Sequence, residues 1–108
     1  MPVYFGTNFD NTIPGSATND TIYAFQGDDL VDPLGGDDLV LLDAGNDTMG
    51  SSGGNDTGYG GTGNDTLFGG DGNDSLIGNT GADGLYGHAG DDTMRGGDQS
   101  DTMVGANG

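Results

Sequence analysis

The 108-residue chain contains no cysteine, lysine, glutamate or tryptophan, and Arg95 is its only arginine. Without cysteine, neither disulfides nor thiolate metal sites can stabilise so small a chain. Apolar residues make up 31% of the sequence, too few for a conventional globular core. No apolar run is long enough to span a membrane. The first residues also lack the basic and apolar regions of a Sec-type signal peptide.

All eighteen acidic residues are aspartate, and they give the chain a net charge of −17. Low hydrophobicity combined with a high charge of one sign is typical of a disordered chain. The 25 glycines raise the entropic cost of ordering the backbone further. Charge repulsion excludes nucleic acid and an anionic membrane surface as partners. A compact state therefore requires cations that neutralise the carboxylates.

Ten of the aspartates recur at a constant spacing of nine residues. They are Asp20, Asp29, Asp38, Asp47, Asp56, Asp65, Asp74, Asp83, Asp92 and Asp101. A period of nine fits neither a helix nor a simple strand. It indicates a repeat architecture, in which one small unit is stacked many times. The clearest copies span residues 60–68, 69–77 and 78–86, with the periodic aspartate at position six.

The residues around each periodic aspartate predict a turn followed by a strand. Position four is glycine in eight of the ten copies, and position five is Asn or Asp in eight; these residue types accept positive φ and form tight turns. Position eight is aliphatic or methionine in every copy but one, where Gly58 stands. This predicts one inward side chain in each short strand. Two copies would complete one 18-residue coil with a strand on each face, so the predicted fold class is all-β.

The repeats divide the chain into one body and two incomplete ends. We predict a single repeat domain over residues 1–108, with ten copies in residues 15–104. Residues 1–14 form a degenerate capping copy in which Asn11 replaces the aspartate. Residues 105–108 begin a further copy that does not reach its aspartate, so we expect the chain to be a fragment of a longer array.

Stacked coils would align alternate aspartates along two edges of the molecule. Within each row, aspartates in neighbouring coils would lie about 4.8 Å apart. Their like charges would repel strongly unless divalent ions lie between the coils. Carboxylate and turn carbonyl oxygens suit Ca²⁺, which accepts six to eight flexible oxygen ligands. Zn²⁺ prefers Cys or His, of which only His88 is present, and Mg²⁺ requires a stricter octahedron. Filling four gaps in each row would take roughly eight Ca²⁺ ions, which nearly balances the net charge.

The unit resembles GGxGxDxUx, the nonapeptide of the repeats-in-toxin (RTX) or haemolysin-type calcium-binding family. The resemblance covers about residues 15 to 104. It implies a parallel β-roll, a right-handed β-solenoid, with Ca²⁺ held in the turns. Members of this family are typically bacterial proteins that leave the cell by type I secretion, without an N-terminal signal, and fold in external calcium. The resemblance therefore implies an extracellular location.

The resemblance also implies a set of calcium ligands. The side-chain ligands would be the ten periodic aspartates. The backbone carbonyl ligands would come from the best-matching turns, at Gly60, Gly61, Gly63, Gly69, Gly70, Gly72, Gly78, Gly81, Gly87 and Gly90.

Some copies depart from the family pattern. Those that begin at Ala24, Pro33 and Leu42 lack the first two glycines, so we expect their turns to bind Ca²⁺ less well or not at all. The strongest sites are expected between Asp56 and Asp92. The gap at Gly58 is expected to be filled by Met49 or Tyr59. The aspartates at position five, Asp28, Asp37 and Asp91, are expected to stabilise turns.

Nothing in the repeat predicts catalysis by this segment. Ser75, His88 and Asp92 supply the residue types of a catalytic triad, but a coil this regular lacks a deep apolar cleft. We therefore predict a structural calcium-binding module of a secreted bacterial protein, whose parent could be a secreted hydrolase.

Position nine faces outward and is often aromatic or aliphatic. One face would carry Tyr23, Leu41, Tyr59 and Ile77, and the other Phe68, Tyr86 and Val104. Exposed stripes of this kind often mark a contact surface. They could receive a flanking domain, a second copy of the chain, or a surface ligand such as a glycan or ice. The alternative function is therefore an adhesin-like binding module.

Overall fold

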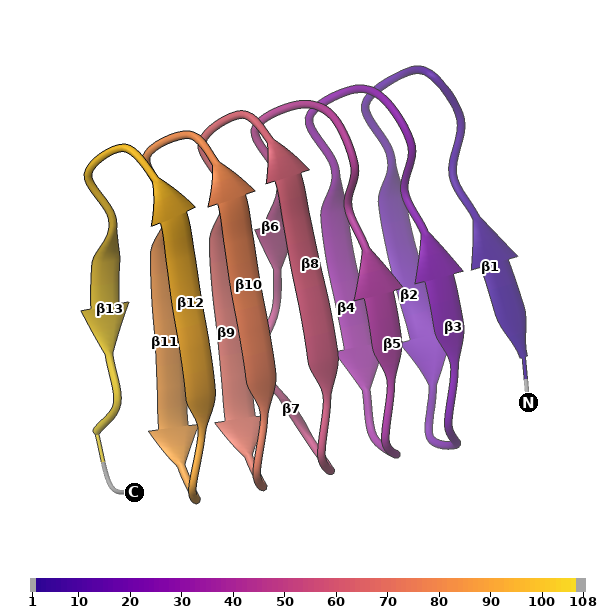
Figure 1. The fold of residues 1–108 in the computed structure, drawn as a ribbon. Helices are drawn as coiled ribbons and strands as arrows, with labels where there is room; N and C mark the ends of the chain where they lie inside the picture. Colours follow the sequence, from indigo (N-terminus) through magenta and orange to yellow (C-terminus); the bar gives the residue numbers. More distant parts are fainter. Residues whose placement is uncertain (1, 107–108) are drawn as a thin grey trace.

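The computed structural model describes residues 2–106, and every regular element within that range is a β-strand (Figure 1). A six-stranded sheet contains β1 (Val3–Phe5), β3 (Thr21–Tyr23), β5 (Leu39–Leu41), β8 (Thr57–Thr62), β10 (Ser75–Thr80) and β12 (Thr93–Asp98), in that order. A seven-stranded sheet contains β2 (Thr12–Ser16), β4 (Leu30–Leu34), β6 (Thr48–Met49), β7 (Ser52–Gly53), β9 (Thr66–Asp71), β11 (Gly84–Ala89) and β13 (Thr102–Val104).

Both sheets are parallel, and each residue pairs with the one 18 positions later. Ile22 of β3 pairs with Val40 of β5, and Leu67 of β9 pairs with Leu85 of β11. The chain ascends through the six-stranded sheet and descends through the seven-stranded one, and the coil is right-handed (Figure 1). The result is a thin two-layered body with extents of 34 × 33 × 14 Å. The predicted parallel β-roll with an 18-residue coil is confirmed.

A single ladder of apolar side chains fills the space between the two sheets. It consists mainly of position-eight residues: Ile13, Ile22, Val31, Val40, Met49, Leu67, Leu76 and Leu85 are all buried. Position eight is the second residue of its strand, so its side chain points to the opposite face from those of its two neighbours in the chain. Burial of each of these side chains contributes about 1.5–3 kcal/mol. So thin a core cannot by itself offset the entropy of ordering a glycine-rich chain.

The gap at Gly58 is closed by its neighbours inside the roll. A methyl group at Gly58 would lie 2.7 Å from Met49 Sδ and 3.0 Å from Leu67 Cδ2. Met49 therefore fills the gap, as predicted, together with Leu67. The prediction for Tyr59 is wrong, because alternation along β8 points this side chain outward, where it is 37% exposed.

Position one also points into the roll, which the sequence pattern did not reveal. Ala24 and Leu42 are fully buried in the same apolar cluster, and Pro33 is buried as well. The reason is the two-residue alternation of the strand, which continues past position nine into the first residue of the next copy.

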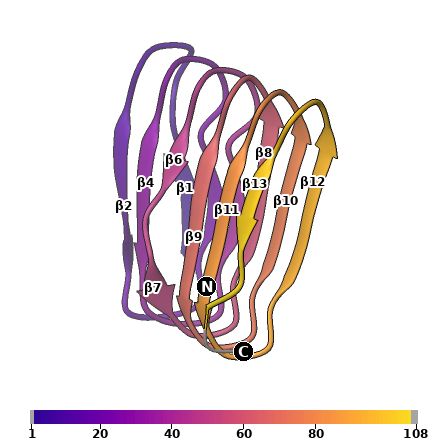
Figure 2. The same cartoon turned by 90° about the vertical axis from the view of Figure 1, so that its left-hand side faces the viewer.

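The two ends of the roll join the same ladders. β1 pairs with β3 and β2 pairs with β4, so residues predicted to cap the array continue its coils. Residues 107–108, the end of the predicted truncated copy, lie outside the described range. Figure 2 shows β6 and β7 as two short strands where the neighbouring coils have one longer strand, β4 or β9.

Candidate metal sites

The ten periodic aspartates lie in two rows of turns, one along each edge of the roll. The lower turns in Figure 1 lead from the seven-stranded to the six-stranded sheet, and the upper turns lead back. The lower row contains Asp20, Asp38, Asp56, Asp74 and Asp92. The upper row contains Asp29, Asp47, Asp65, Asp83 and Asp101. The alternating rows expected from the sequence are therefore formed.

These carboxylates point into the roll rather than toward solvent. The eight from Asp20 to Asp83 are only 1–3% exposed, while Asp92 and Asp101 in the last coils are partly exposed. Position six is the last residue of the turn, and its side chain lies on the inner side of the strand that follows. A buried carboxylate is costly unless it is hydrogen-bonded, protonated or paired with a cation.

In every periodic aspartate except Asp20, one carboxylate oxygen joins neighbouring coils. The N–H of Asp20 donates to Asp38 Oδ1 at 2.8 Å, and the N–H of Asp47 donates to Asp65 Oδ1 at 2.9 Å. The same bond recurs along both rows up to Asp83, whose N–H donates to Asp101 Oδ1 at 2.9 Å. These bonds fix the orientation of the side chains and leave the second oxygen, Oδ2, directed inward.

In most copies this second oxygen has no hydrogen-bond partner. The buried, unpaired Oδ2 atoms belong to Asp29, Asp38, Asp47, Asp65, Asp74, Asp83 and Asp92. An unsatisfied buried acceptor costs about 1–3 kcal/mol, and more when it is charged. Seven such atoms in two regular rows are therefore candidate ligands for a cation that the protein itself does not supply.

Glycine at position one leaves a space on which oxygens converge. A methyl group at Gly60 would lie 2.5 Å from Asp65 Oδ2 and 2.8 Å from the carbonyl oxygen of Gly78, in the next coil. At Gly78 the same space is bounded by Asp83 Oδ2 and by the carbonyl oxygen of Gly96. We call this space the glycine cradle. It brings an unpaired carboxylate oxygen close to a backbone carbonyl, so hard oxygen donors line it.

Positions two and four shape the turn around the cradle. The predicted carbonyl donors Gly63, Gly72, Gly81 and Gly90 have φ between +114° and +121°. A side chain at Gly63 would collide with the carbonyl oxygen of Gly45, 18 residues earlier. At position two, Gly61 and Gly70 have φ of +99° and +104°. Glycine allows this left-handed backbone without steric cost.

A second ladder of side chains joins the turns on the outside. The N–H of Asn46 donates to Asp28 Oδ1, and the N–H of Asn55 donates to Asp37 Oδ1, both at 2.8 Å. The turn-stabilising role predicted for Asp28 and Asp37 is confirmed. Asp91 takes part through its backbone, whose N–H donates to Asn73 Oδ1.

Burial shifts the protonation of the inward carboxylates. Desolvation raises the pKa of Asp47 to about 7 and the pKa of Asp38, Asp65 and Asp74 to about 6. The backbone N–H bond to each carboxylate lowers the pKa, and neighbouring aspartates raise it. These groups are therefore held near the boundary between the neutral and charged forms when no cation accompanies them.

The donors in the turns fit calcium. Within residues 2–106, no three acidic or imidazole side chains gather at one point, so a metal ion would be held by carboxylates together with backbone carbonyls. A ligand set made only of oxygens suits a hard, flexible cation such as Ca²⁺. The unpaired Oδ2 atoms and the adjacent cradles supply donors of this type, so the residues present fit the ion.

Comparison with known families agrees with this geometry. The profile of the RTX calcium-binding nonapeptide repeat matches the chain in four copies, over residues 5–40, 34–49, 50–85 and 77–108. The chain belongs to the RTX calcium-binding repeat family. RTX repeats bind calcium in general, and their β-roll is a structural module rather than a catalytic one. No curated protein and no solved structure gave a significant match to the chain.

The RTX turns differ in ways that the sequence reading missed. Asp20 and Asp56 are the buried periodic aspartates without an unpaired oxygen, because Ser16 and Ser52 donate hydrogen bonds to them. Serine at position two is the signal that could have identified these turns. The individual calcium ligands assigned from the family pattern remain predictions.

The residues considered for a catalytic triad are not assembled into one. His88 is exposed on the seven-stranded sheet, where its ring stacks on Phe68 with centroids 5.9 Å apart. Asp92 Oδ1 accepts the N–H of Asp74. In the part of the chain that the structure describes, no hydrogen bond joins Ser75, His88 and Asp92. That part also contains no helix of the length and hydrophobicity needed to cross a bilayer.

Proposed function

We propose that this chain is a calcium-dependent β-roll that folds when calcium binds and serves as a stabilising module of a secreted bacterial protein. The observation that carries the proposal is the row of buried, unpaired Oδ2 atoms beside glycine cradles. Secretion rests on the family, whose members are typically exported without an N-terminal signal.

Calcium would supply positive charge and an oxygen-coordinating centre within the turns. The side chains of Asp65, Asp74 and Asp83 would hold it, with backbone carbonyls of the position-one and position-four glycines. Neutralising the rows removes the repulsion that keeps the chain unfolded, and the apolar ladder can then close. If every gap were filled, roughly eight ions would bind. An affinity of about 10⁻⁴–10⁻³ M, as in extracellular calcium modules, would leave the calcium sites empty in the cytoplasm.

A calcium titration followed by far-UV circular dichroism tests this function. The chain should have much less β structure in chelator than in calcium, and Ca²⁺ in the millimolar range should increase the β signal, which excess chelator reverses. Mg²⁺ at the same concentrations is the control for ionic strength and should produce much less β structure. A spectrum that is unchanged by Ca²⁺ contradicts the proposal.

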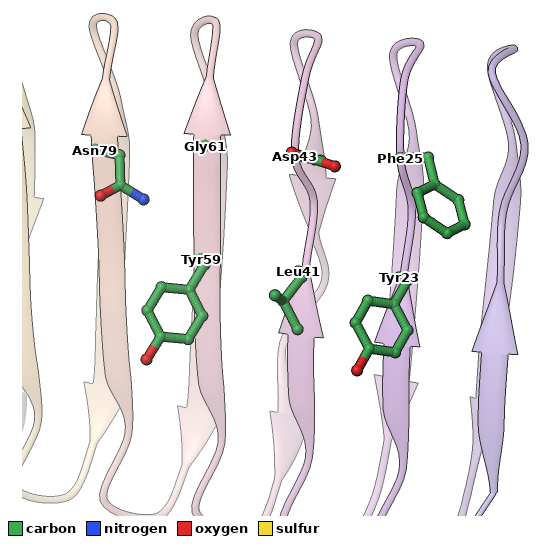
Figure 3. Close-up of a pocket in the computed structure, with 7 residues that line it drawn as sticks. All are labelled: Tyr23, Phe25, Leu41, Asp43, Tyr59, Gly61 and Asn79. Carbon is green, nitrogen blue, oxygen red and sulfur yellow. The ribbon is translucent and has the colours of Figure 1, made fainter.

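A second candidate function rests on a groove on the six-stranded sheet. The groove has a volume of about 250 Å³. Figure 3 shows one row of its residues, Tyr23, Leu41 and Tyr59, beside a second row. The second row consists of Phe25, Asp43, Gly61 and Asn79. Aromatic rings combined with a carboxylate and an amide suit a ligand that has both apolar faces and hydroxyl groups.

For this groove we propose a neutral glycan as the occupant. The net charge of −17 disfavours anionic ligands, and the tyrosine rings on either side of Leu41 offer platforms for sugar rings. Binding of neutral polysaccharides to the calcium-loaded chain should be lost in Tyr59→Ala. Tyr86→Ala, on the opposite sheet, is the matched control and should leave binding intact. Equal binding by the wild type and Tyr59→Ala contradicts this function and leaves the calcium role untouched.

A further inference from the structure

We infer that the two halves of the roll are held together by different means. The N-terminal half (residues 3–56) is closed by its own side chains, and the C-terminal half (residues 57–104) is closed by calcium. The N-terminal half therefore stays folded without calcium and provides the template on which the C-terminal coils form. This inference rests on the proposed calcium function, because it assigns the ions to particular turns.

The first observation is the unequal distribution of the apolar core. Seven of the ten buried apolar residues lie in the N-terminal half: Ile13, Ile22, Ala24, Val31, Val40, Leu42 and Met49. The C-terminal half has three, namely Leu67, Leu76 and Leu85. Apolar burial therefore favours the N-terminal half strongly.

The second observation is what stands at position one. In the upper turns, the residues from the N-terminus to the C-terminus are Ala24, Leu42, Gly60, Gly78 and Gly96. Leu42 is fully buried and directs its side chain to the interior side of the turn, where Gly60 leaves a cradle. Buried Pro33 does the same in the lower row. An apolar side chain thus takes the place that an ion would occupy.

The third observation concerns Ser16 and Ser52. Of the ten residues at position two, only these two do not have a positive φ. The Ser16 hydroxyl donates to Asp20 Oδ1 at 2.8 Å, and the Ser52 hydroxyl donates to Asp56 Oδ2 at 2.5 Å. The N–H of Ser16 also donates to Asp20 Oδ2 at 2.6 Å. In these two turns a hydroxyl group satisfies the carboxylate that elsewhere lacks a partner.

The C-terminal half has neither substitute. Its five position-one residues are all glycine: Gly60, Gly69, Gly78, Gly87 and Gly96. The Oδ2 atoms of Asp65, Asp74, Asp83 and Asp92 are unpaired, and no serine occupies position two. Asp29, Asp38 and Asp47 in the N-terminal half are also unpaired, but the copies of these three begin with Ala24, Pro33 and Leu42.

This division predicts fewer tight calcium sites than the number of gaps. Only three gaps have glycine at position one in both flanking turns: those between Gly60 and Gly78, Gly78 and Gly96, and Gly69 and Gly87. The full chain should therefore hold about three ions tightly, rather than the roughly eight that filling every gap would require.

Amide hydrogen exchange of the full chain, followed by NMR with and without calcium, tests the inference. In chelator, the strand amides of Ile22 and Val40 should remain protected while those of Leu67 and Leu85 exchange freely. Calcium should then protect both pairs. If both pairs become protected together as calcium is added, the inference is wrong and the calcium function stands. If calcium protects neither pair, or if all four are protected in chelator, both proposals fail.

Substitution of Leu42 provides a second test. Leu42→Gly opens a cradle beside Asp47, so protection of Val40 should become calcium-dependent and the bound calcium, measured after dialysis, should rise by one ion per chain. Leu67→Ala is the matched control, because it removes core volume without opening a cradle. Ser52→Gly should likewise make the turn at Asp56 calcium-dependent. If neither Leu42→Gly nor Ser52→Gly changes the calcium content or the calcium dependence of protection, the inference is overturned.

Discussion

At the scale of single residues, the turns place unusual demands on the backbone. Except at the two serines, position two adopts a left-handed conformation even where it is not glycine, with φ of +75° at Phe25 and Leu34 and +71° at His88. An L-residue with a bulky side chain pays about 1–2 kcal/mol for this conformation. Tertiary context holds it in place, because neighbouring coils bond on both sides of each turn.

Leu34→Gly should therefore stabilise the roll. Leu34 is about half exposed, so removing its side chain loses little buried area. Release of the left-handed strain, less the greater freedom of glycine in the unfolded chain, should leave a gain of about 0.5–1 kcal/mol. Urea unfolding in saturating calcium measures it. Leu30→Gly, exposed on the same sheet and without positive φ, should destabilise; a loss of stability in Leu34→Gly would contradict the strain.

Asp65→Asn should weaken calcium binding. The substitution keeps the shape of the side chain but removes the charge of a carboxylate whose Oδ2 faces the Gly60 cradle. Loss of a charged ligand of this kind should raise the calcium concentration at the folding midpoint by about tenfold. Asp71→Asn, at an exposed position on β9, is the control for net charge. Equal shifts in the two variants would show that the effect is general electrostatics rather than ligation.

At the scale of strands and turns, much of the fold could be predicted because each nonapeptide repeats the same pattern of residue types. The strand at position eight and the glycine turn at position four follow directly from alternation and from the tolerance of positive φ. The inward direction of the Ala24 and Leu42 side chains could not be predicted from the sequence, because it depends on the strand continuing into the first residue of the next copy. The hydroxyl contacts of Ser16 and Ser52 were marked in the sequence only by serine at position two, a weak signal because serine is common in ordinary turns.

Leu76→Ala should strongly lower the free energy of unfolding of the roll. Leu76 is fully buried in β10 and lies next to the gap at Gly58, so few neighbours can relax into the new cavity. The expected loss is about 2–4 kcal/mol in calcium-saturated urea unfolding. Ile77→Ala, one residue further along the same strand and facing outward, should cost much less. Similar losses for the two variants would contradict a single interior ladder.

The rows of aspartates should also make the metal-free chain respond to pH in an unusual direction. Burial raises the pKa of Asp47 to about 7 and that of Asp65 to about 6, above the ordinary value near 4. A raised pKa contributes stability that is fully present below the unfolded value and is lost as pH rises through the folded one. Without calcium, β structure should therefore be greater at pH 4 than at pH 8.

Circular dichroism in chelator from pH 4 to pH 8 measures this response. Calcium and protons should compete, so the calcium concentration needed for folding at pH 8 should shift when the pH is lowered through 6. A metal-free chain that is more ordered at pH 8 than at pH 4 would contradict the burial of the carboxylates.

At the scale of the whole molecule, repulsion between the aspartates opposes folding, and burial of the apolar core favours it. A body 14 Å thick with a net charge of −17 has too little apolar interior to fold against its own repulsion. In the proposed function, calcium bound between the coils would offset this repulsion. The unequal core of the two halves means that this dependence on the ion increases along the chain.

The central claim is that calcium lies in the glycine cradles, between coils and beside the unpaired carboxylate oxygens. A crystal structure of the calcium-saturated chain, with anomalous scattering used to identify the ions, tests it most directly. We predict calcium between the turns at Gly60 and Gly78, within ligand distance of Asp65 Oδ2, and at the equivalent positions beside Asp74 and Asp83. An ordered roll with calcium only on its outer surface, and none in these turns, would contradict the account.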